Sequence, residues 1–138
     1  MAPKVPSSAS PTFALDLATG VPAYRQIIDQ ILGSVASGAL RGGNQLPTVR
    51  QMAVNLSINP NTVVRAYREL EIRGVLATQQ GIGTFVTTEL IKRDEAIHQK
   101  QLDQLVSDVM ARAGAAGITG TELVSRLREF LAEQKRGS

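Results

Sequence analysis

The chain has 138 residues, enough for one domain of ordinary size with a small appendage. The chain has no cysteine, so we expect neither a disulfide nor a thiolate metal site. It has no apolar run approaching about 18 residues and no apolar stretch near its N-terminus, so we expect neither a membrane span nor a secretory signal. A cytoplasmic protein is therefore expected. Residues 22–87 carry the whole net charge of +3, since basic and acidic side chains cancel in residues 88–138, and this bias favours contact between the N-terminal half and a polyanion.

The N-terminal part predicts a tail, a short extended segment and a helix. Residues 1–12 are rich in proline, serine and alanine, which predicts a disordered tail. Alternating apolar residues then predict an extended segment that docks on the domain: Phe13, Leu15 and Leu17. A helix is expected to begin near Pro22 and to end at Gly38. Its apolar face comprises Tyr24, Ile27, Ile28, Ile31, Leu32 and Val35.

Two further helices are predicted by their start signals. Thr48 is a good N-cap, and Gln51 three residues later completes a capping box. Asn59 is expected to cap the next helix, with Pro60 in its first position. The tight connection before it contains Ile58, which we expect to fill the gap between the two helices. The stripe of the last helix that faces the core is Val63, Ala66, Tyr67 and Leu70.

A hairpin and two helices are expected after these elements. Residues 75–88 contain two short β-type runs around a glycine-containing segment, which predicts a hairpin. Three helices followed by a hairpin describe a winged helix-turn-helix, expected over residues 13–87. A long helical pattern follows from about residue 88 to 113, and Thr119 or Thr121 can cap a last helix.

These patterns together predict a fold class. Because two helices have little core of their own, we expect residues 88–138 to pair with a second copy and to form a dimerisation domain. The predicted fold is mainly α with a small β-hairpin wing: a winged helix-turn-helix followed by a two-helix C-terminal dimerisation hairpin.

The predicted helix-turn-helix indicates a DNA-binding surface. The second helix of such a pair enters the major groove, where asparagine can bond adenine and arginine can bond guanine. Backbone N–H groups and capping side chains at helix starts favour phosphate, and the wing tip offers exposed amides. The residues expected at double-stranded operator DNA are Thr48, Arg50, Asn59, Asn61, Thr62, Arg65, Arg68, Gln79, Gln80 and Gly81.

Other interpretations compete with this one. A capped helix start and a solvated basic face occur in many proteins, so the winged helix could serve protein–protein contact without specific DNA binding, although the basic bias argues against it. An enzyme is not expected, because the chain has one histidine and no nucleophile with an orienting base. Asp94 and His98 could hold a metal from one helix face, but a solvated face is favoured, so no metal or cofactor is expected. A small-molecule effector, not identified by the sequence, is compatible with DNA binding.

The stretch LPTVRQMAVNLSINPNTVVRAYRELEIRGVLATQQGIGTFV, residues 46–86, resembles the DNA-binding domain of GntR-type regulators. The preceding GVPAYRQI and the short two-helix C-terminus resemble the YtrA-like subfamily, and the resemblance covers about residues 13–135. It implies a bacterial transcription regulator, expected to be a repressor, that binds a palindromic operator as a homodimer. The C-terminal part is too short for the effector-binding domain of larger members.

The resemblance also implies residue roles. Arg50 matches a DNA-contacting position, residues 59–65 contain the recognition segment, and the wing tip includes Gln80 and Gly81. The sequence departs from some relatives at three positions: Pro60 and Val64 replace arginine, and Ile82 replaces lysine.

Overall fold

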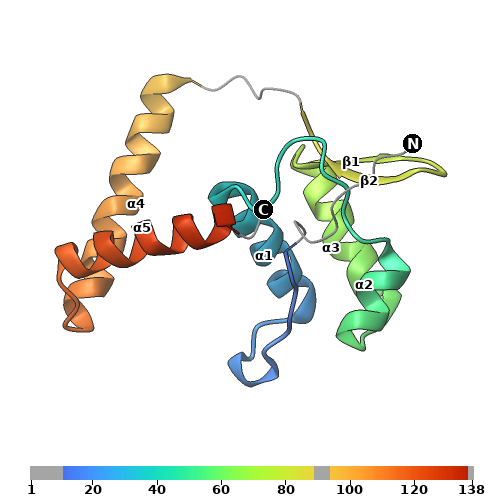
Figure 1. The fold of residues 1–138 in the computed structure, drawn as a ribbon, viewed down its shortest axis with the longest axis horizontal. Coiled ribbons are helices and arrows are strands. Elements are labelled where there is room, and N and C mark those ends of the chain that lie inside the picture. Colours follow the sequence, from blue (N-terminus) through green and yellow to red (C-terminus); the bar gives the residue numbers. More distant parts are fainter. Residues whose placement is uncertain (1–10, 89–93, 137–138) are drawn as a thin grey trace. The chain divides into compact units, whose positions relative to one another are not determined.

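The computed structural model describes residues 11–88 and 94–136 (Figure 1). The elements in chain order are the 3-10 helix η2 (Leu17–Thr19), α1 (Ala23–Ser37), α2 (Val49–Leu56), α3 (Pro60–Ile72), β1 (Leu76–Gln79), β2 (Gly83–Val86), α4 (Glu95–Ala115) and α5 (Gly120–Arg136). They form two compact units, of which the second spans Leu90–Glu133. The predicted fold class is confirmed as three helices, a two-stranded wing and two C-terminal helices.

The core of the first unit lies between α1, α2, α3 and the base of the wing. The isoleucine face of α1 is fully buried, as the helical period predicts: Ile27, Ile28 and Ile31. The predicted stripe of α3 is buried against it, and the partly buried Ile58 packs on the same core. Burial of these apolar side chains is the main stabilising contribution to this unit.

Side-chain caps fix where α2 and α3 begin. The Thr48 hydroxyl accepts a hydrogen bond from the Gln51 N–H at 3.1 Å, and the Gln51 side chain accepts one from the Thr48 N–H at 2.9 Å. The Asn59 side chain accepts from the Asn61 N–H at 2.8 Å, and Pro60 is the first residue of α3. Both predicted helix starts are therefore confirmed.

The hydroxyl of Tyr67 ties α3 to the chain segment that enters α2. It donates a hydrogen bond to the carbonyl oxygen of Pro47 at 2.7 Å. Burial raises the pKa of Tyr67 well above its ordinary value, because the phenolate would lose its hydration. The hydroxyl therefore keeps its proton and remains a donor through the physiological pH range.

The wing is an antiparallel hairpin in which Leu76 pairs with Val86 and Gln79 pairs with Gly83. Its buried ends, Leu76 and Val86, anchor it to the core, whereas the tip is exposed. At the tip the Ile82 N–H donates to the Gln79 carbonyl oxygen at 2.9 Å, and Gly81 has a φ of +78°. A type II turn requires a positive φ at this position, which explains the glycine.

Two glutamine side chains of α1 hold the extended segment that precedes it. The Gln30 amide accepts from the N–H of Ala14 and donates to its carbonyl oxygen. The Gln26 amide bonds the N–H and carbonyl of Asp16 in the same way, at 2.8 and 2.9 Å. Phe13 and Leu15 dock on the core as expected, but Leu17 is 85% exposed because the chain has by then turned into η2. The expectation for Leu17 was therefore wrong.

In the second unit, α4 begins later than the pattern indicates. Thr88 is not helical, and α4 starts at Glu95, where the Asp94 carboxylate accepts from the N–H groups of Ala96 and Ile97. The apolar positions Leu90 and Ile91 of the predicted pattern, like residues 1–10 of the predicted tail, lie outside the described residues.

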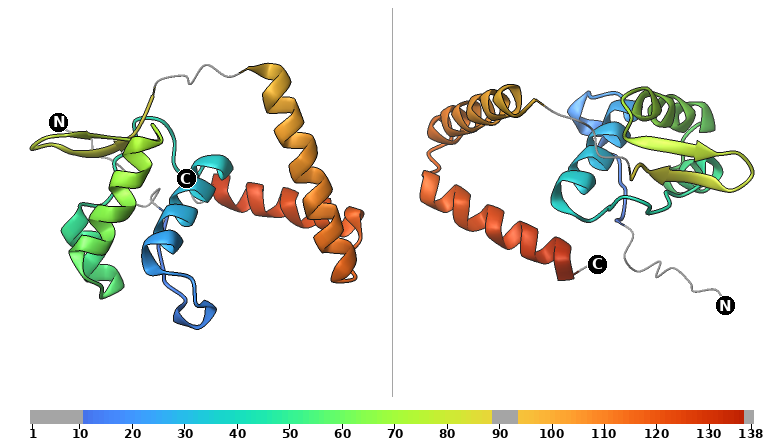
Figure 2. Two further views of the ribbon diagram at one scale, coloured as in Figure 1. Left: turned by 180° about the vertical axis from the view of Figure 1, so that it is seen from behind. Right: turned by 90° about the horizontal axis from the view of Figure 1, so that it is seen from above.

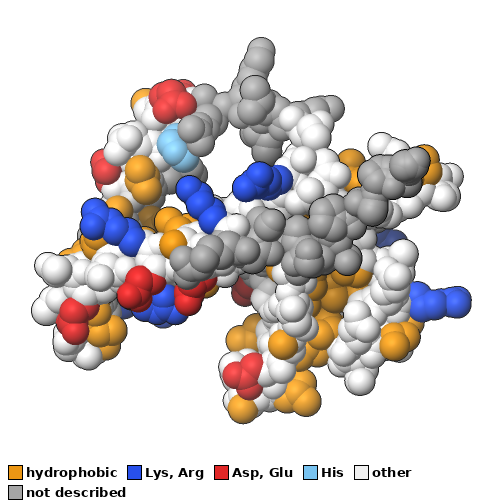
Figure 3. All heavy atoms as spheres, viewed as in Figure 1, with side chains coloured by type: hydrophobic (Ala, Val, Ile, Leu, Met, Phe, Trp, Pro, Cys, Tyr) orange, Lys and Arg blue, Asp and Glu red, His pale blue; other side chains and the backbone are white. Residues whose placement is uncertain are grey.

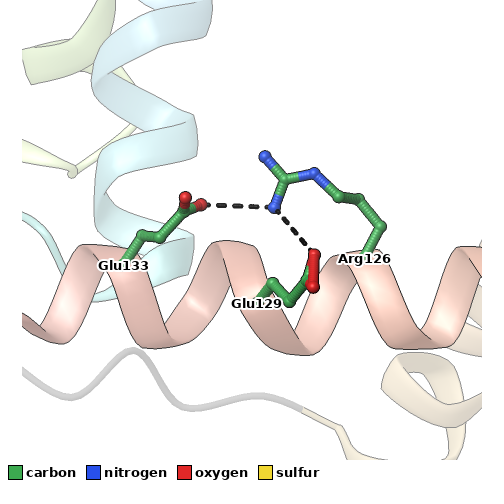
Figure 4. A network of polar contacts seen from close by, with 3 residues as sticks. All are labelled: Arg126, Glu129 and Glu133. Atoms are coloured by element: carbon green, nitrogen blue, oxygen red, sulfur yellow. Dashed lines mark hydrogen bonds and ion pairs between the residues drawn. The ribbon is translucent and has the colours of Figure 1, made fainter.

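The helix α5 is capped by Thr119, the first of the two predicted caps. Its hydroxyl accepts from the Glu122 N–H at 3.1 Å, and the Glu122 carboxylate accepts from the Thr119 N–H at 2.9 Å. The hydrogen bonds from Thr119 lower the pKa of Glu122. Further along, Arg126 lies 3.7 Å from Glu129 and 3.2 Å from Glu133 (Figure 4). These exposed ion pairs contribute little to stability and mark a polar flank of the helix.

The two C-terminal helices diverge from their connecting turn (Figure 2). They meet near the turn, where Ala113 is buried and the Ile118 N–H donates to its carbonyl oxygen at 2.8 Å. Beyond it their apolar side chains are 40–59% exposed: Ile97, Leu102, Leu105, Val106, Met110, Val124, Leu127, Phe130 and Leu131. Hydrophobic side chains are visible at the surface of this region (Figure 3). None of the described helices is long and apolar enough to cross a membrane.

Replacing Tyr67 by phenylalanine tests its hydrogen bond. Because the Pro47 carbonyl oxygen would lose its partner, we expect Tyr67→Phe to lower the free energy of unfolding by about 1 kcal/mol in urea titrations. Tyr24→Phe is the matched control, since no described residue bonds the Tyr24 hydroxyl, and a change within about 0.5 kcal/mol is expected. Equal losses in the two variants would contradict the assignment.

Candidate nucleic-acid interface

The outward face of α3 is set by the residues that the helix buries. Val63, Ala66, Tyr67 and Leu70 point into the core, so the side chains half a turn away must face outward. Asn61, Arg65 and Arg68 are exposed, and Thr62 is half-buried at the edge of this face. The structure therefore places these four predicted residues together on the first three turns of one helix. The face ends at Ile72, which is 75% exposed.

The arginines of this surface are not neutralised by nearby carboxylates. Glu69 lies one turn from Arg65 and next to Arg68, yet its carboxylate is bonded by Arg73 at 3.1 Å. Within the described ranges, Arg50, Arg65 and Arg68 have no hydrogen-bond or ion-pair partner. Their charges remain available to a polyanion, which they would attract by releasing its counterions.

The capping side chains of α2 and α3 use their acceptor oxygens within the helices and keep their donor groups available. The oxygen atoms of Thr48 and Asn59 accept from backbone N–H groups of their own helices. The Thr48 hydroxyl proton and the Asn59 amide N–H₂ have no acceptor among the described residues. Both side chains are exposed and lie at helix N-termini, where a phosphate is favoured, so each can cap its helix and donate to DNA at once.

Arg65 makes a contact that the sequence did not predict. Its Cζ atom lies 3.7 Å from the centroid of the Tyr24 ring, and Tyr24 belongs to the first turn of α1. The helical period predicts Tyr24 on the apolar face of α1 but does not indicate this contact. It is half-buried, with its ring against the core, so the contact joins the core to the outward face of α3.

The wing tip presents uncharged polar groups. Gln79, Gln80 and Gly81 are exposed together, as predicted. The neighbouring Gly83 lies close to a side chain from outside the hairpin. A Cβ atom there would collide with the side-chain amide of Gln45, which donates to the Ile82 carbonyl oxygen at 3.2 Å. The absence of a side chain at Gly83 leaves room for Gln45 to form this hydrogen bond to the wing tip.

The alternative metal site on α4 has no support in the geometry. The Asp94 carboxylate is engaged as the N-cap of the helix. Within the described part of the chain, no group of three or more histidine, aspartate or glutamate side chains could hold a metal ion.

Comparisons with known proteins agree with a DNA-binding unit. The family model described as "Bacterial regulatory proteins, gntR family" matches residues 23–86. The HTH-type transcriptional repressor YtrA of Bacillus subtilis is 35% identical over 127 residues, which cover 89% of this chain and 95% of the repressor. The solved structure of YtrA from Sulfolobus acidocaldarius, a GntR-family transcription factor, is 31% identical with a TM-score of 0.53, covering 86% of this chain and 96% of its own.

A transcriptional antiterminator from Listeria monocytogenes EGD-e has a similar structure along nearly the same length. It has a TM-score of 0.64 at 26% identity, covering 88% of this chain and 90% of its own. The likeness therefore extends beyond the first unit to the C-terminal helices.

Replacing Asn59 by aspartate separates helix capping from DNA contact. Aspartate keeps an oxygen that can cap α3, so we expect unfolding stability to change by less than about 0.5 kcal/mol. The same change removes the amide donor and adds a negative charge, so binding to duplex DNA should weaken by about 1–3 kcal/mol in fluorescence titrations.

Asp94→Asn is the matched control, because it exchanges the same two residue types at the cap of α4. It should leave DNA affinity unchanged. Full affinity in Asn59→Asp would contradict a role for this cap at the DNA.

Proposed function

Because the chain belongs to the gntR family of bacterial regulatory proteins, we propose that it represses transcription by binding a two-fold symmetric operator as a homodimer. It is a DNA-binding transcription regulator and not an enzyme, as its family establishes. The observation that carries the proposal is the outward face of α3, where a well-capped helix start is followed by an amide group and by arginines that no carboxylate of the described residues pairs.

The arrangement supports a definite way of docking on DNA. In a helix-turn-helix, the N-terminal half of the second helix reads base edges in the major groove. Asn61 and Arg65 have the side chains that bond adenine and guanine bidentately. Thr48, Arg50 and Asn59 lie at the starts of the two helices, where N–H groups favour phosphate. Thr62 and Arg68 would contact the flanks of the groove.

The wing would make a second contact. Its exposed Gln79, Gln80 and Gly81 offer amide donors and acceptors but no charge. Such a tip can hydrogen-bond in a groove while contributing little to the salt dependence of binding. The affinity for phosphate would therefore come from the arginines of α2 and α3.

The C-terminal helices support the homodimer. Their apolar side chains are exposed along both helices, which diverge and so do not cover one another. Large exposed apolar surfaces are unusual for a monomer in water and mark interaction sites. A second copy of the same unit offers a matching surface, and a two-fold dimer imposes its symmetry on the operator.

Repression is supported by the Bacillus subtilis relative, which is named a transcriptional repressor and is matched along nearly its whole length. Binding to chromosomal DNA would place the protein in the bacterial cytoplasm. The alternative of a winged helix used only for protein–protein contact is not favoured by membership in a family of regulators. A small-molecule effector remains compatible with this proposal.

Selection of bound sequences from random duplex DNA tests the proposal directly. We expect enrichment of a sequence with two inverted half-sites, and we expect the selected site to lower transcription in vitro when it overlaps a promoter. A single asymmetric half-site would contradict the symmetric dimer. Failure to bind any duplex at low salt would contradict DNA binding itself.

Replacing Arg50 or Arg65 by alanine tests the recognition surface. We expect each variant to lose about 1–3 kcal/mol of binding to the selected duplex, because each side chain would leave a base or a phosphate without its partner. Arg126→Ala is the charge-matched control, since it removes one arginine from the flank of α5. Wild-type affinity in both test variants would refute the assigned surface.

A charge placed on the apolar face of α4 tests the dimer. We expect Leu105→Glu to convert the dimer into monomers in sedimentation equilibrium, because the carboxylate would be buried at the interface without a partner. Ala111→Glu is the control, since Ala111 is exposed on the opposite side of the same helix. A dimeric mass in Leu105→Glu would place the interface elsewhere.

A further inference from the structure

The contact between Tyr24 and Arg65 joins a ring that packs on the core to an exposed, charged side chain. The Tyr24 ring packs against the buried core of the first unit and is held at the start of α1. Arg65 is exposed on α3, forty-one residues later in the chain, and its Cζ atom lies 3.7 Å from the ring centroid. This distance matches the stacking of a planar guanidinium on an aromatic face.

Stacking leaves the hydrogen-bonding edge of the guanidinium free. All of its N–H donors lie in the guanidinium plane, whereas the ring covers only one face of that plane. Among the residues that the structure describes, none bonds the guanidinium of Arg65 or the hydroxyl of Tyr24. Arg65 therefore has one face in contact with the ring, while its fork remains able to bond a base edge or a phosphate.

We propose that Tyr24 is a positioning residue that holds Arg65 ready to read DNA and so contributes to sequence specificity. The inference rests on the proposed function, because it assigns to Tyr24 a role in the recognition made by α3. A free arginine side chain loses conformational entropy when it is ordered at an interface. A guanidinium already stacked on a fixed ring loses less, so more of the energy of its contact appears as affinity for the correct sequence.

Two aspects of the geometry favour positioning over simple packing. A tyrosine needed only to fill the core would not require a charged side chain over its ring. Glu69, the carboxylate on α3 nearest in sequence that could otherwise orient Arg65, is bonded instead by Arg73. The aromatic ring is therefore the group of the described chain that orients Arg65.

The test compares Tyr24→Leu with Tyr24→Phe in the full chain, each with and without Arg65→Ala. Affinity is measured for the selected duplex and for a scrambled duplex, and the unfolding midpoint is measured for every variant. We expect Tyr24→Leu to weaken binding to the selected duplex about two- to fivefold, while binding to the scrambled duplex is unchanged. Tyr24→Phe should behave like the wild type, since phenylalanine keeps the aromatic face.

In the Arg65→Ala background, Tyr24→Leu should have no further effect on binding, because the side chain that it positions is gone. In the background that keeps Arg65, the loss of DNA affinity caused by Tyr24→Leu should be the same at low and moderate salt, since the substitution removes no charge. If Tyr24→Leu does not fold, Tyr24→Met replaces it with a flexible side chain that fills a similar volume.

Three results would overturn the inference: unchanged or tighter specific binding in Tyr24→Leu, an equal loss with and without Arg65, or an equal loss for selected and scrambled duplexes. Tighter binding would mean that the ring holds Arg65 away from DNA. A wild-type protein that bound no duplex would instead overturn the proposed function, so the two failures are distinguishable.

Discussion

The structure depends on one constraint, which is that α3 must bury one side completely while its opposite side stays open. Val63 and Leu70 have no exposed surface, and they pack against the isoleucines of α1. The helix is thereby fixed in rotation about its own axis, so the directions of Asn61, Arg65 and Arg68 follow from the core rather than from polar contacts. The hydrogen bond from Tyr67 to Pro47 adds a second attachment and fixes how α2 meets α3.

The second unit, in contrast to the first, buries almost none of its described side chains. Among its described side chains only Ala113 is buried, so the unit does not form a core of the kind that stabilises the first. Good caps at Asp94 and Thr119 define where its helices begin, but capping contributes about 1 kcal/mol per helix and does not hold two helices together. In our proposal the missing burial is supplied by another copy, so that folding of this unit and assembly on DNA are coupled.

Local signals in the sequence were sufficient for much of this architecture. In the caps at Thr48 and Asn59, the isoleucine face of α1 and the stripe of α3, each residue lies no more than four positions from the next, and all of these features are confirmed. The winged fold also followed from the order of the elements.

The features that sequence reasoning missed depend on contacts between distant residues. The stack of Arg65 on Tyr24 and the bracing of the wing by Gln45 join positions that no periodicity relates. Asp94 shows a different limit, because the sequence favoured a solvated helix face there over a metal ligand, whereas the structure makes its carboxylate the N-cap of α4. Its value as a cap became evident only when the helix boundary was known.

The paired amides of Gln26 and Gln30 have a consequence for how the protein can change over evolutionary time. Both side chains form hydrogen bonds to main-chain atoms, so the side chain at position 14 takes no part in its hydrogen bonds to Gln30 and can be substituted without removing them. Glutamate could not take the place of either glutamine, because a carboxylate lacks the N–H₂ group that bonds the carbonyl oxygen. The extended segment before α1 is thus held by two side chains of that helix in addition to the docking of its own Phe13 and Leu15 on the core.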